Sequence, residues 1–554
     1  MKIERRFVYS CSAAFLLLLG LAFFLPPGAV WITDNGNKYI QMRNFDAGQG
    51  GLIRHPCPEL FPTAGFHFFR REGGAVSFYP GYLSAATTPF YRLFGERGVL
   101  FWPILATLVL LFLAGHFLRL PPLGLLLATP LLFYSLLLWE MTPSVCLVLG
   151  GFILGLRGGF FGCGVLWGLS LFMREEAYFC AAAFGAALLV CGKWRELLRF
   201  SGGFLLPALP LWILQALLYG HIFGLHGKFY YLNNNASFSL LTQVRAAAFN
   251  LFHHLFRFDG WGRGAWGSLA AWSALLPLTA GAAPGFRRWL EFKYAAATVY
   301  LVCTVFLTAG LWFQAVPVYT AAGAVGLFST TPLAAGFLVN WRAFLGTRRF
   351  RVWTWALIFY ILGVPLLMTA SDVGLVWGAR HFLVILPLLL YLSFIGFRRL
   401  GNPGAPLPAR AELRKLLPPT ALGASVFLQC YGLYALNRVA EDSSYIEAAL
   451  LRAPGKTVVT DVFYLPEQTP RLFFGKTVVQ VLTPKDLEVL KGFLARRGEK
   501  EFTLVLSPRF RRLPDPVLRE LITLFPLTAP PVRLTGKGGF PDLFVSQCRS
   551  AAPR

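Results

Sequence analysis

The sequence is poor in charged residues, and acidic residues are the scarcest of them. Only 14% of the 554 residues are Asp, Glu, Lys or Arg, whereas soluble proteins carry roughly 25%. The mean hydropathy is +0.57. Of the 26 acidic residues, 14 lie in residues 1–440 and 12 in residues 441–554. This deficit excludes a soluble globular chain, and its uneven distribution indicates a long membrane part followed by a water-soluble tail.

Recognisable metal motifs are also missing. The nine cysteines form no C-x-x-C pair, and no Cys and His spacing suits a zinc site. Cys57 and Cys548 lie outside the membrane part, and the sequence leaves open whether they form a disulfide. The sequence therefore establishes no cofactor. A divalent metal is compatible with the sequence but not indicated by it.

The net charge of +25 does not indicate a nucleic-acid partner. Nucleic-acid binding needs basic residues gathered on one soluble face, whereas many of these sit in short clusters between apolar runs. Such clusters are typical of loops that set the orientation of a membrane protein and face anionic lipid. Membrane lipids are therefore expected partners, and nucleic acid is not.

Apolar runs suitable for spanning a bilayer number thirteen. Several are shorter than the ~17–20 residues needed to cross upright, so we expect those to be buried in the bundle or to end at a cavity. The runs lie near 7–25, 98–118, 121–139, 142–156, 159–173, 176–192, 200–219, 265–283, 294–312, 321–340, 352–370, 381–397 and 419–436.

Thirteen spans place every compact basic cluster on one side of the membrane. Lys2, Arg5 and Arg6 put the N-terminus inside, and alternation then brings Arg119, Arg157 and the clusters at 193–199, 287–293, 342–351 and 398–415 to the same side. The first run is interpreted as an uncleaved anchor, because no small-x-small cleavage site follows Pro26 and Pro27. We expect an integral membrane protein with its N-terminus inside and its tail outside.

The expected fold class is an α-helical polytopic membrane protein with a small C-terminal α/β extracytoplasmic domain. Residues 1–436 form the transmembrane domain with outer loops at 26–97 and 220–264, and residues 437–554 form the tail domain. β-rich runs at 457–463, 477–482, 502–506 and 543–545 predict strands. One tail helix is expected to begin at the Thr483 cap, with Asp486 in its first turn, and to end near Gly498.

Asp34 and Lys38 follow the first span at the spacing of one helical turn. One interpretation is structural: Thr33 or Asp34 caps an interfacial helix, and Lys38 extends its ammonium to the interface. The functional interpretation places an acid and a cation side by side facing an outward cavity.

Other charged residues lie at the outer ends of the spans. Glu140 ends the third span, and Arg174, Glu175 and Glu176 join two short ones, where charges below the surface need partners. Trp377 and Arg380 precede the twelfth span. The structural alternative for residues 174–176 is a solvated turn, and for Trp377 and Arg380 it is an interfacial pair. The functional alternative for Arg380 is contact with a phosphate.

These motifs together resemble the GT-C superfamily of integral-membrane glycosyltransferases, which includes protein O-mannosyltransferases and lipid A aminoarabinose transferase. The resemblance covers most of residues 1–400. It rests on DNGNK at 34–38, SFYPGY at 77–82, PFYRLFG at 89–95, WEMTP at 139–143, REE at 174–176, GLFSTTP at 326–332 and WGAR at 377–380. The family often doubles its first acid, whereas Asn35 follows Asp34 here.

The resemblance implies transfer of a sugar from a polyprenyl-phosphate-linked donor to a lipid, glycan or protein acceptor at the outer face. Asp34 would be the catalytic base, and Lys38, Arg174 and Arg380 would contact the donor phosphate. Glu140, Glu175, Glu176 and Trp377 would position the sugar or the acceptor. The alternatives are a polytopic transporter or lipid flippase, and a non-catalytic envelope-assembly protein.

Overall fold

The structure is a computed structural model that describes residues 5–26, 30–62, 68–225, 255, 326–367, 380–400, 408–462, 464–508, 513–536 and 542–550. Its contacts divide the chain into two compact units. The first unit is Met1–Ala22, Trp102–Leu136 and Glu140–Tyr434; the second is Phe23–Phe101, Leu137–Trp139 and Ala435–Arg554. The loop at 26–97 therefore groups with the tail, and the domain boundary expected after residue 436 falls inside one helix, α20 (Pro408–Arg452).

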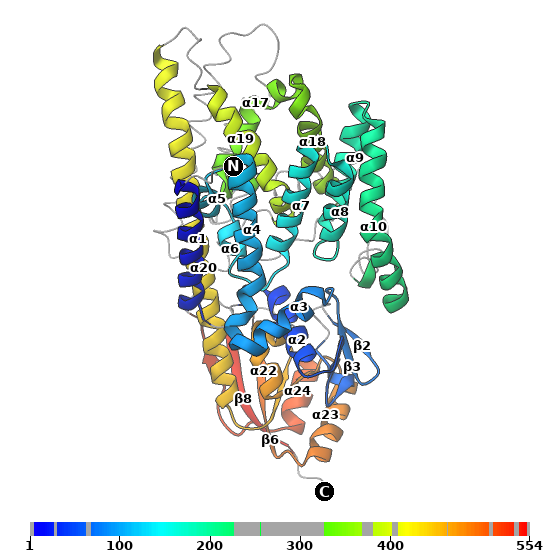
Figure 1. Ribbon diagram of the computed structural model, residues 1–554. Helices are drawn as coiled ribbons and strands as arrows, with labels where there is room; N and C mark the ends of the chain where they lie inside the picture. Colours follow the sequence, from blue (N-terminus) through cyan, green and yellow to red (C-terminus); the bar gives the residue numbers. More distant parts are fainter. Residues whose placement is uncertain are drawn as a thin grey trace. The chain divides into compact units, whose positions relative to one another are not determined.

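The first unit is helical (Figure 1). Its described helices are α1 (Arg5–Phe24), α4 (Phe101–Leu118), α5 (Pro122–Leu127), α6 (Leu131–Tyr134), α7 (Met141–Leu156), α8 (Phe160–Ser170), α9 (Glu176–Val190), α10 (Trp194–Tyr219), α16 (Leu327–Thr330), α17 (Ala335–Gly346), α18 (Arg348–Leu367) and α19 (Leu386–Leu400). Two 3-10 helices, η3 (Pro332–Ala334) and η4 (Arg380–Ile385), precede α17 and α19.

Within the described residues, four helical stretches are long and apolar enough to cross a membrane. They are Arg5–Phe24, Tyr82–Leu118, Trp194–Tyr219 and Arg380–Arg398, and α7, α8 and α9 are shorter apolar helices. The expected helical membrane architecture is thus confirmed in outline. The count of thirteen stays a prediction, since the runs at 265–283 and 294–312 and most of the loop at 220–264 lie outside the described residues.

The run at 121–139, expected to span the membrane, is not one helix. Prolines at 121, 122 and 130 lack the N–H that a continuous helix needs, and the run forms only the short helices α5 and α6. Its side chains are nearly all buried, and the hydroxyl of Thr129 donates to the carbonyl oxygen of Leu125 at 2.8 Å. The run is apolar because it fills the core of the unit. The described part of the run at 321–340 is likewise broken, at Pro332, into α16, η3 and α17.

Small residues let α8 and α10 approach closely. A Cβ atom on Gly164 would lie 2.1 Å from the carbonyl oxygen of Phe200, and one on Gly203 would lie 2.0 Å from that of Phe161. Larger side chains would push the two backbones apart. This packing is typical of helices in membranes, where close backbone contact replaces the hydrophobic drive of water.

The second unit combines helices with two sheets (Figure 1). Its N-terminal part contains α2 (Thr33–Asp46), β1 (Leu52–Arg54), η1 (Pro58–Leu60), β2 (Phe68–Arg71), β3 (Gly74–Ser77), α3 (Tyr82–Phe94) and η2 (Gly95–Leu100). The tail contributes β4 (Thr457–Thr460), α21 (Leu465–Gln468), α22 (Pro470–Gly475), β5 (Thr477–Gln480), α23 (Pro484–Arg497), β6 (Glu501–Leu506), α24 (Asp515–Leu524), β7 (Val532–Leu534) and β8 (Leu543–Arg549).

The strands form a three-stranded antiparallel sheet, β1-β3-β2, and a five-stranded mixed sheet, β5-β4-β6-β8-β7. Strand β4 runs parallel to β5 and β6, while β8 runs antiparallel to β6 and β7. The four strands expected in the tail are present, and β7 was not expected. Helix α23 is capped as the sequence predicts: the Thr483 side chain accepts from the Asp486 N–H, and Gly498 is left-handed at φ 61°.

The core of the five-stranded sheet includes residues from the N-terminal loop. Cys57 and Leu60 are buried in one cluster with Val459, Phe502 and Cys548. Both cysteines are free thiols in this structure. The loop at 26–97 therefore folds with the tail, and this core joins segments about 400 residues apart in the sequence.

A buried histidine links the loop to the tail. The His55 ring is 8% exposed, with Nδ1 2.8 Å from the carbonyl oxygen of Cys57 and Nε2 3.0 Å from that of Val478. Burial lowers the pKa of His55 and outweighs the two carbonyl contacts, which oppose it. The ring therefore stays neutral in the fold at a pH where the unfolded chain already binds a proton.

We expect this histidine to make the second unit less stable in acid. The unfolded pKa is about 6.5, so the stability is fully present above that pH and is lost as the pH falls below it. His55→Gln should flatten the dependence of the unfolding temperature on pH between about 7.5 and 5.5. Thermal unfolding of both proteins across that range measures the effect; parallel curves would assign the acid sensitivity to other groups.

Candidate active site

Asp34 and Lys38 lie one turn apart on α2, as the sequence predicts, and both are buried. Asp34 is 7% exposed and Lys38 is 1% exposed. The cap interpretation of this segment is wrong, because the residue that precedes the helix is Ile32, and the side chain of Asn35 accepts its N–H at 3.3 Å. Lys38 does not extend to an interface either. The pair is therefore a buried acid and a buried cation on one helix.

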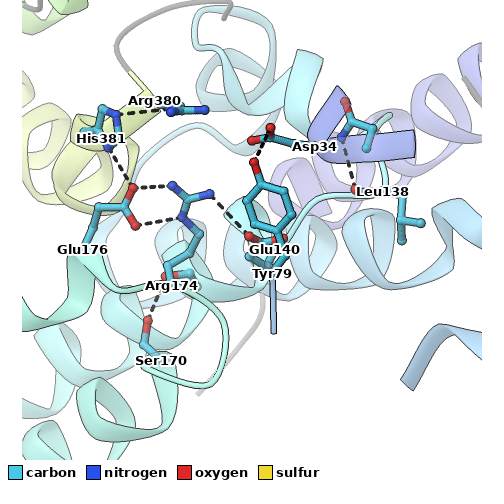
Figure 2. Close-up of polar contacts among 11 residues, drawn as sticks. Asp34, Tyr79, Leu138, Glu140, Ser170, Arg174, Glu176, Arg380 and His381 are labelled. Atoms are coloured by element: carbon cyan, nitrogen blue, oxygen red, sulfur yellow. Dashed lines mark hydrogen bonds and ion pairs between the residues drawn. The ribbon is translucent and has the colours of Figure 1, made fainter. Parts of the chain in front are cut away.

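Tyr79 contacts both of these residues. Its hydroxyl donates to Oδ1 of Asp34 at 2.5 Å (Figure 2), and Nζ of Lys38 lies 4.1 Å from the centre of its ring. The ring of Trp139 is 5.9 Å from the same ammonium. Aromatic faces stabilise a buried cation, and the phenol stabilises the ionised carboxylate. Tyr79 lies in the SFYPGY segment at 77–82, and no role was predicted for it from the sequence.

A second polar cluster lies in the first unit, where α7 and α9 begin. Nε of Arg174 donates to Oε2 of Glu176 at 2.8 Å, Nη2 contacts Oε1 of the same carboxylate, and Nη1 lies 3.4 Å from Oε1 of Glu140 (Figure 2). Glu176 and Glu140 are each 7% exposed. The two buried carboxylates depend on the one guanidinium between them, since its removal would leave both negative charges without it.

His381 extends this cluster to Arg380. Its Nδ1 lies 2.8 Å from Oε1 of Glu176, and its Nε2 lies 3.1 Å from Nε of Arg380 (Figure 2). An arginine Nε only donates, so Nε2 must accept and the proton sits on Nδ1, facing Glu176. Tyr360 fixes the backbone there by donating to the His381 carbonyl oxygen at 2.5 Å. His381 directly follows Arg380 and was assigned no role from the sequence.

The structure thus brings four of the expected site residues together in the first unit: Glu140, Arg174, Glu176 and Arg380. Glu175 is the half-buried residue that precedes α9. Trp377 lies outside the described residues. Asp34 and Lys38 belong to the second unit.

The structure indicates no metal centre in the described part of the chain. No three His, Cys, Asp or Glu side chains are grouped there so as to hold a metal ion. The sequence left a divalent metal open, and this result adds no site for one.

Comparison with known proteins gives one kind of match. No family model matches the chain, and none of the curated proteins matches it. Two crystal structures of ArnT from Cupriavidus metallidurans are similar to it, one bound to undecaprenyl phosphate and one in the apo state. Each covers 98% of this chain and 97% of the ArnT chain at 14% identity, with TM-scores of 0.42 and 0.44.

ArnT is a lipid A aminoarabinose transferase of the GT-C group, the type of enzyme that the motifs resemble. Identity of 14% and TM-scores under 0.5 do not define an activity. What this chain can do chemically follows from its own residues.

Proposed function

We propose that the protein is an integral-membrane glycosyltransferase that moves a sugar from a polyprenyl-phosphate-linked donor to a lipid, glycan or protein acceptor at the outer face of the membrane. The observation that carries the proposal is the environment of Asp34. A carboxylate that is 7% exposed, held by the Tyr79 hydroxyl at 2.5 Å and one turn from Lys38, is costly to bury and suited to proton transfer.

The chemistry needs a single carboxylate. Asp34 takes the proton from the acceptor O–H or N–H, and the acceptor atom forms a bond to the anomeric carbon of the sugar. The bond from that carbon to the phosphate oxygen breaks, and its electron pair leaves on the polyprenyl phosphate. This leaving group is a stable anion, so it needs cations and not an acid. Glycoside hydrolysis, by contrast, needs two carboxylates flanking the bond.

Cationic residues are the proposed contacts for the donor phosphate. Lys38 is assigned this role on charge and on its place one turn from Asp34 on α2. Arg380 is assigned it on its permanent charge and on its place beside the polar cluster, where its Nε donates to Nε2 of His381 at 3.1 Å. Arg174 has the same assignment from the sequence, but its contacts to Glu176 and Glu140 favour a structural role. Glu140, Glu175, Glu176 and Trp377 remain proposed as residues that position the sugar or acceptor.

The proposed location is the bacterial inner membrane, with the N-terminus cytoplasmic and the tail domain of residues 437–554 periplasmic. The one-sided distribution of basic clusters supports this orientation. Reporter fusions after Arg119, Arg399 and Arg554 should report inside, inside and outside. A C-terminus on the cytoplasmic side would contradict the orientation and the proposed place of Asp34.

Donor consumption tests the proposed activity. The purified protein, reconstituted in vesicles, is supplied with polyprenyl phosphates carrying labelled hexose, pentose or amino sugars, with and without envelope extract as acceptor. A transferase consumes one of these donors and releases polyprenyl phosphate when acceptor is present. A flippase moves intact donor between leaflets, and an assembly protein does neither, so either of those results would refute the proposal.

A further inference from the structure

A continuous line of hydrogen bonds joins the tail to Tyr79. Nδ2 of Asn37 donates to Oε1 of Glu467 at 3.3 Å, and the Ser77 hydroxyl donates to Oδ1 of Asn37 at 2.5 Å. The N–H of Tyr79 in turn donates to the Ser77 hydroxyl oxygen at 3.0 Å. All the bonds lie within the second unit and connect α21 in the tail with the segment that follows β3.

The residues of this line are buried. Glu467 is 2% exposed, Asn37 is 0% and Ser77 is 3%. Every bond is polarised in the same direction, since each group donates toward the Glu467 carboxylate, and such chains strengthen one another in a low-dielectric interior. A buried carboxylate at this point costs stability that an apolar residue of similar size would not. The line of hydrogen bonds therefore fixes a polar geometry at a cost in the stability of the fold.

The backbones of α2 and α21 are in direct contact at the same point. A Cβ atom on Gly36 would lie 1.5 Å from the carbonyl oxygen of Glu467, so only glycine permits this approach. Asn37 directly follows Gly36, and Asp34 lies two residues before Gly36. The tail segment is thus built directly against the helix that carries the proposed base.

The main chain of Tyr79 is held from both sides. Its N–H is bound through Ser77, and its carbonyl oxygen accepts from Nε2 of Gln41 at 2.8 Å. Because the backbone is fixed, the phenol is aimed at Asp34 and its hydroxyl stays within 2.5 Å of the carboxylate. A shift of Ser77 would move the phenol relative to Asp34.

We propose that Glu467 is a positioning residue for the transfer reaction. Through Asn37 and Ser77 it fixes Tyr79, and Tyr79 orients the carboxylate of Asp34 toward the acceptor proton. The inference rests on the proposed function, and it gives the tail domain a role at the site. Glu467 contacts neither donor nor acceptor in this account.

Steady-state kinetics of Glu467 variants in the full-length protein test this role, with a labelled polyprenyl-phosphate sugar as donor. Glu467→Ala should lower kcat by roughly 10- to 100-fold while the KM for the donor changes by less than about 3-fold, since small misplacements of catalytic groups cost rate. Glu467→Gln keeps an acceptor oxygen for Asn37 and should restore most of kcat. Gln468→Ala is the matched control: this neighbour is 4% exposed and bonds to Ser443, outside the line.

A double-variant cycle separates positioning from a general loss of structure. If Glu467 acts through Tyr79, Glu467→Ala should lower kcat by less than about 2-fold in a protein that already carries Tyr79→Phe. If the two substitutions act independently, their fold losses of kcat should multiply. Ser77→Ala cuts the line at its middle and serves if Glu467→Ala does not fold. It should reproduce the loss of kcat and the same coupling to Tyr79→Phe.

The outcomes distinguish this inference from the proposed function. If the wild-type protein consumes no donor, the proposed function fails. Suppose instead that the wild type is active. The positioning role is then overturned, and the transferase activity stands, if the Glu467 and Ser77 variants have the same kcat as Gln468→Ala. The same holds if their fold losses of kcat multiply with the fold loss caused by Tyr79→Phe.

Discussion

Asp34→Asn should lower turnover strongly while leaving the fold and donor binding intact. Loss of a general base costs roughly 10²–10⁴ in rate. The substitution keeps an Oδ1 that can accept the Tyr79 hydroxyl, so the 2.5 Å contact survives while the basic lone pair is lost. The rate of donor consumption, its binding affinity and the unfolding temperature together measure the effect.

Asp46→Asn is the matched control. Asp46 is the last residue of the same helix, and its partner Arg92 is exposed, so it lies away from the buried pair. We expect its turnover to stay within about 2-fold of wild type, as for a surface substitution away from the site. Near-normal turnover in Asp34→Asn would remove Asp34 as the base and make Glu140 and Glu175 the next candidates.

Arg174→Ala should be among the most destabilising substitutions in the first unit. It leaves the carboxylates of Glu176 and Glu140 buried without their guanidinium, and breaking a buried ion pair in this way costs about 3–5 kcal/mol. The sequence predicts a phosphate contact at Arg174, which stays a proposal; in this structure the side chain contacts the two acids. Thermal unfolding in detergent, with and without added donor lipid, measures the loss.

Two further variants show whether charge compensation is the cause. Adding Glu176→Gln to Arg174→Ala removes one of the uncompensated charges and should recover part of the stability. Arg92→Ala breaks an exposed ion pair with Asp46 and should change stability little, because water already solvates both groups. A double variant as unstable as Arg174→Ala would show that packing, and not charge, explains the loss.

The sequence predicted local features well because they depend on neighbouring residues. The spacing of Asp34 and Lys38 placed both on one helix turn, and the cap at Thr483 and the stop at Gly498 bounded α23 correctly. The strands of the tail followed from β-branched runs. Each of these features depends on contacts within about ten residues, which a single sequence displays.

Features that depend on distant residues were missed. The partners of Asp34 and Asn37 are Tyr79 and Glu467, which lie 45 and 430 positions away in the chain. The run at 121–139 looked like one continuous helix because hydropathy does not register the breaks that its prolines introduce. Lys38 looked like an interfacial cation because its burial depends on the aromatic rings of Tyr79 and Trp139.

The anomeric configuration of the transferred sugar shows whether Asp34 acts as a base in a single displacement. With Asp34 as a base and no nucleophile from the protein, the acceptor displaces the phosphate in one step, and each such displacement inverts the anomeric carbon. The measurement uses a polyprenyl-phosphate donor of known configuration and reads the product by its NMR coupling constants. Asp34 as the base predicts inversion, and a product with retained configuration would contradict that role, because a single displacement cannot retain the configuration.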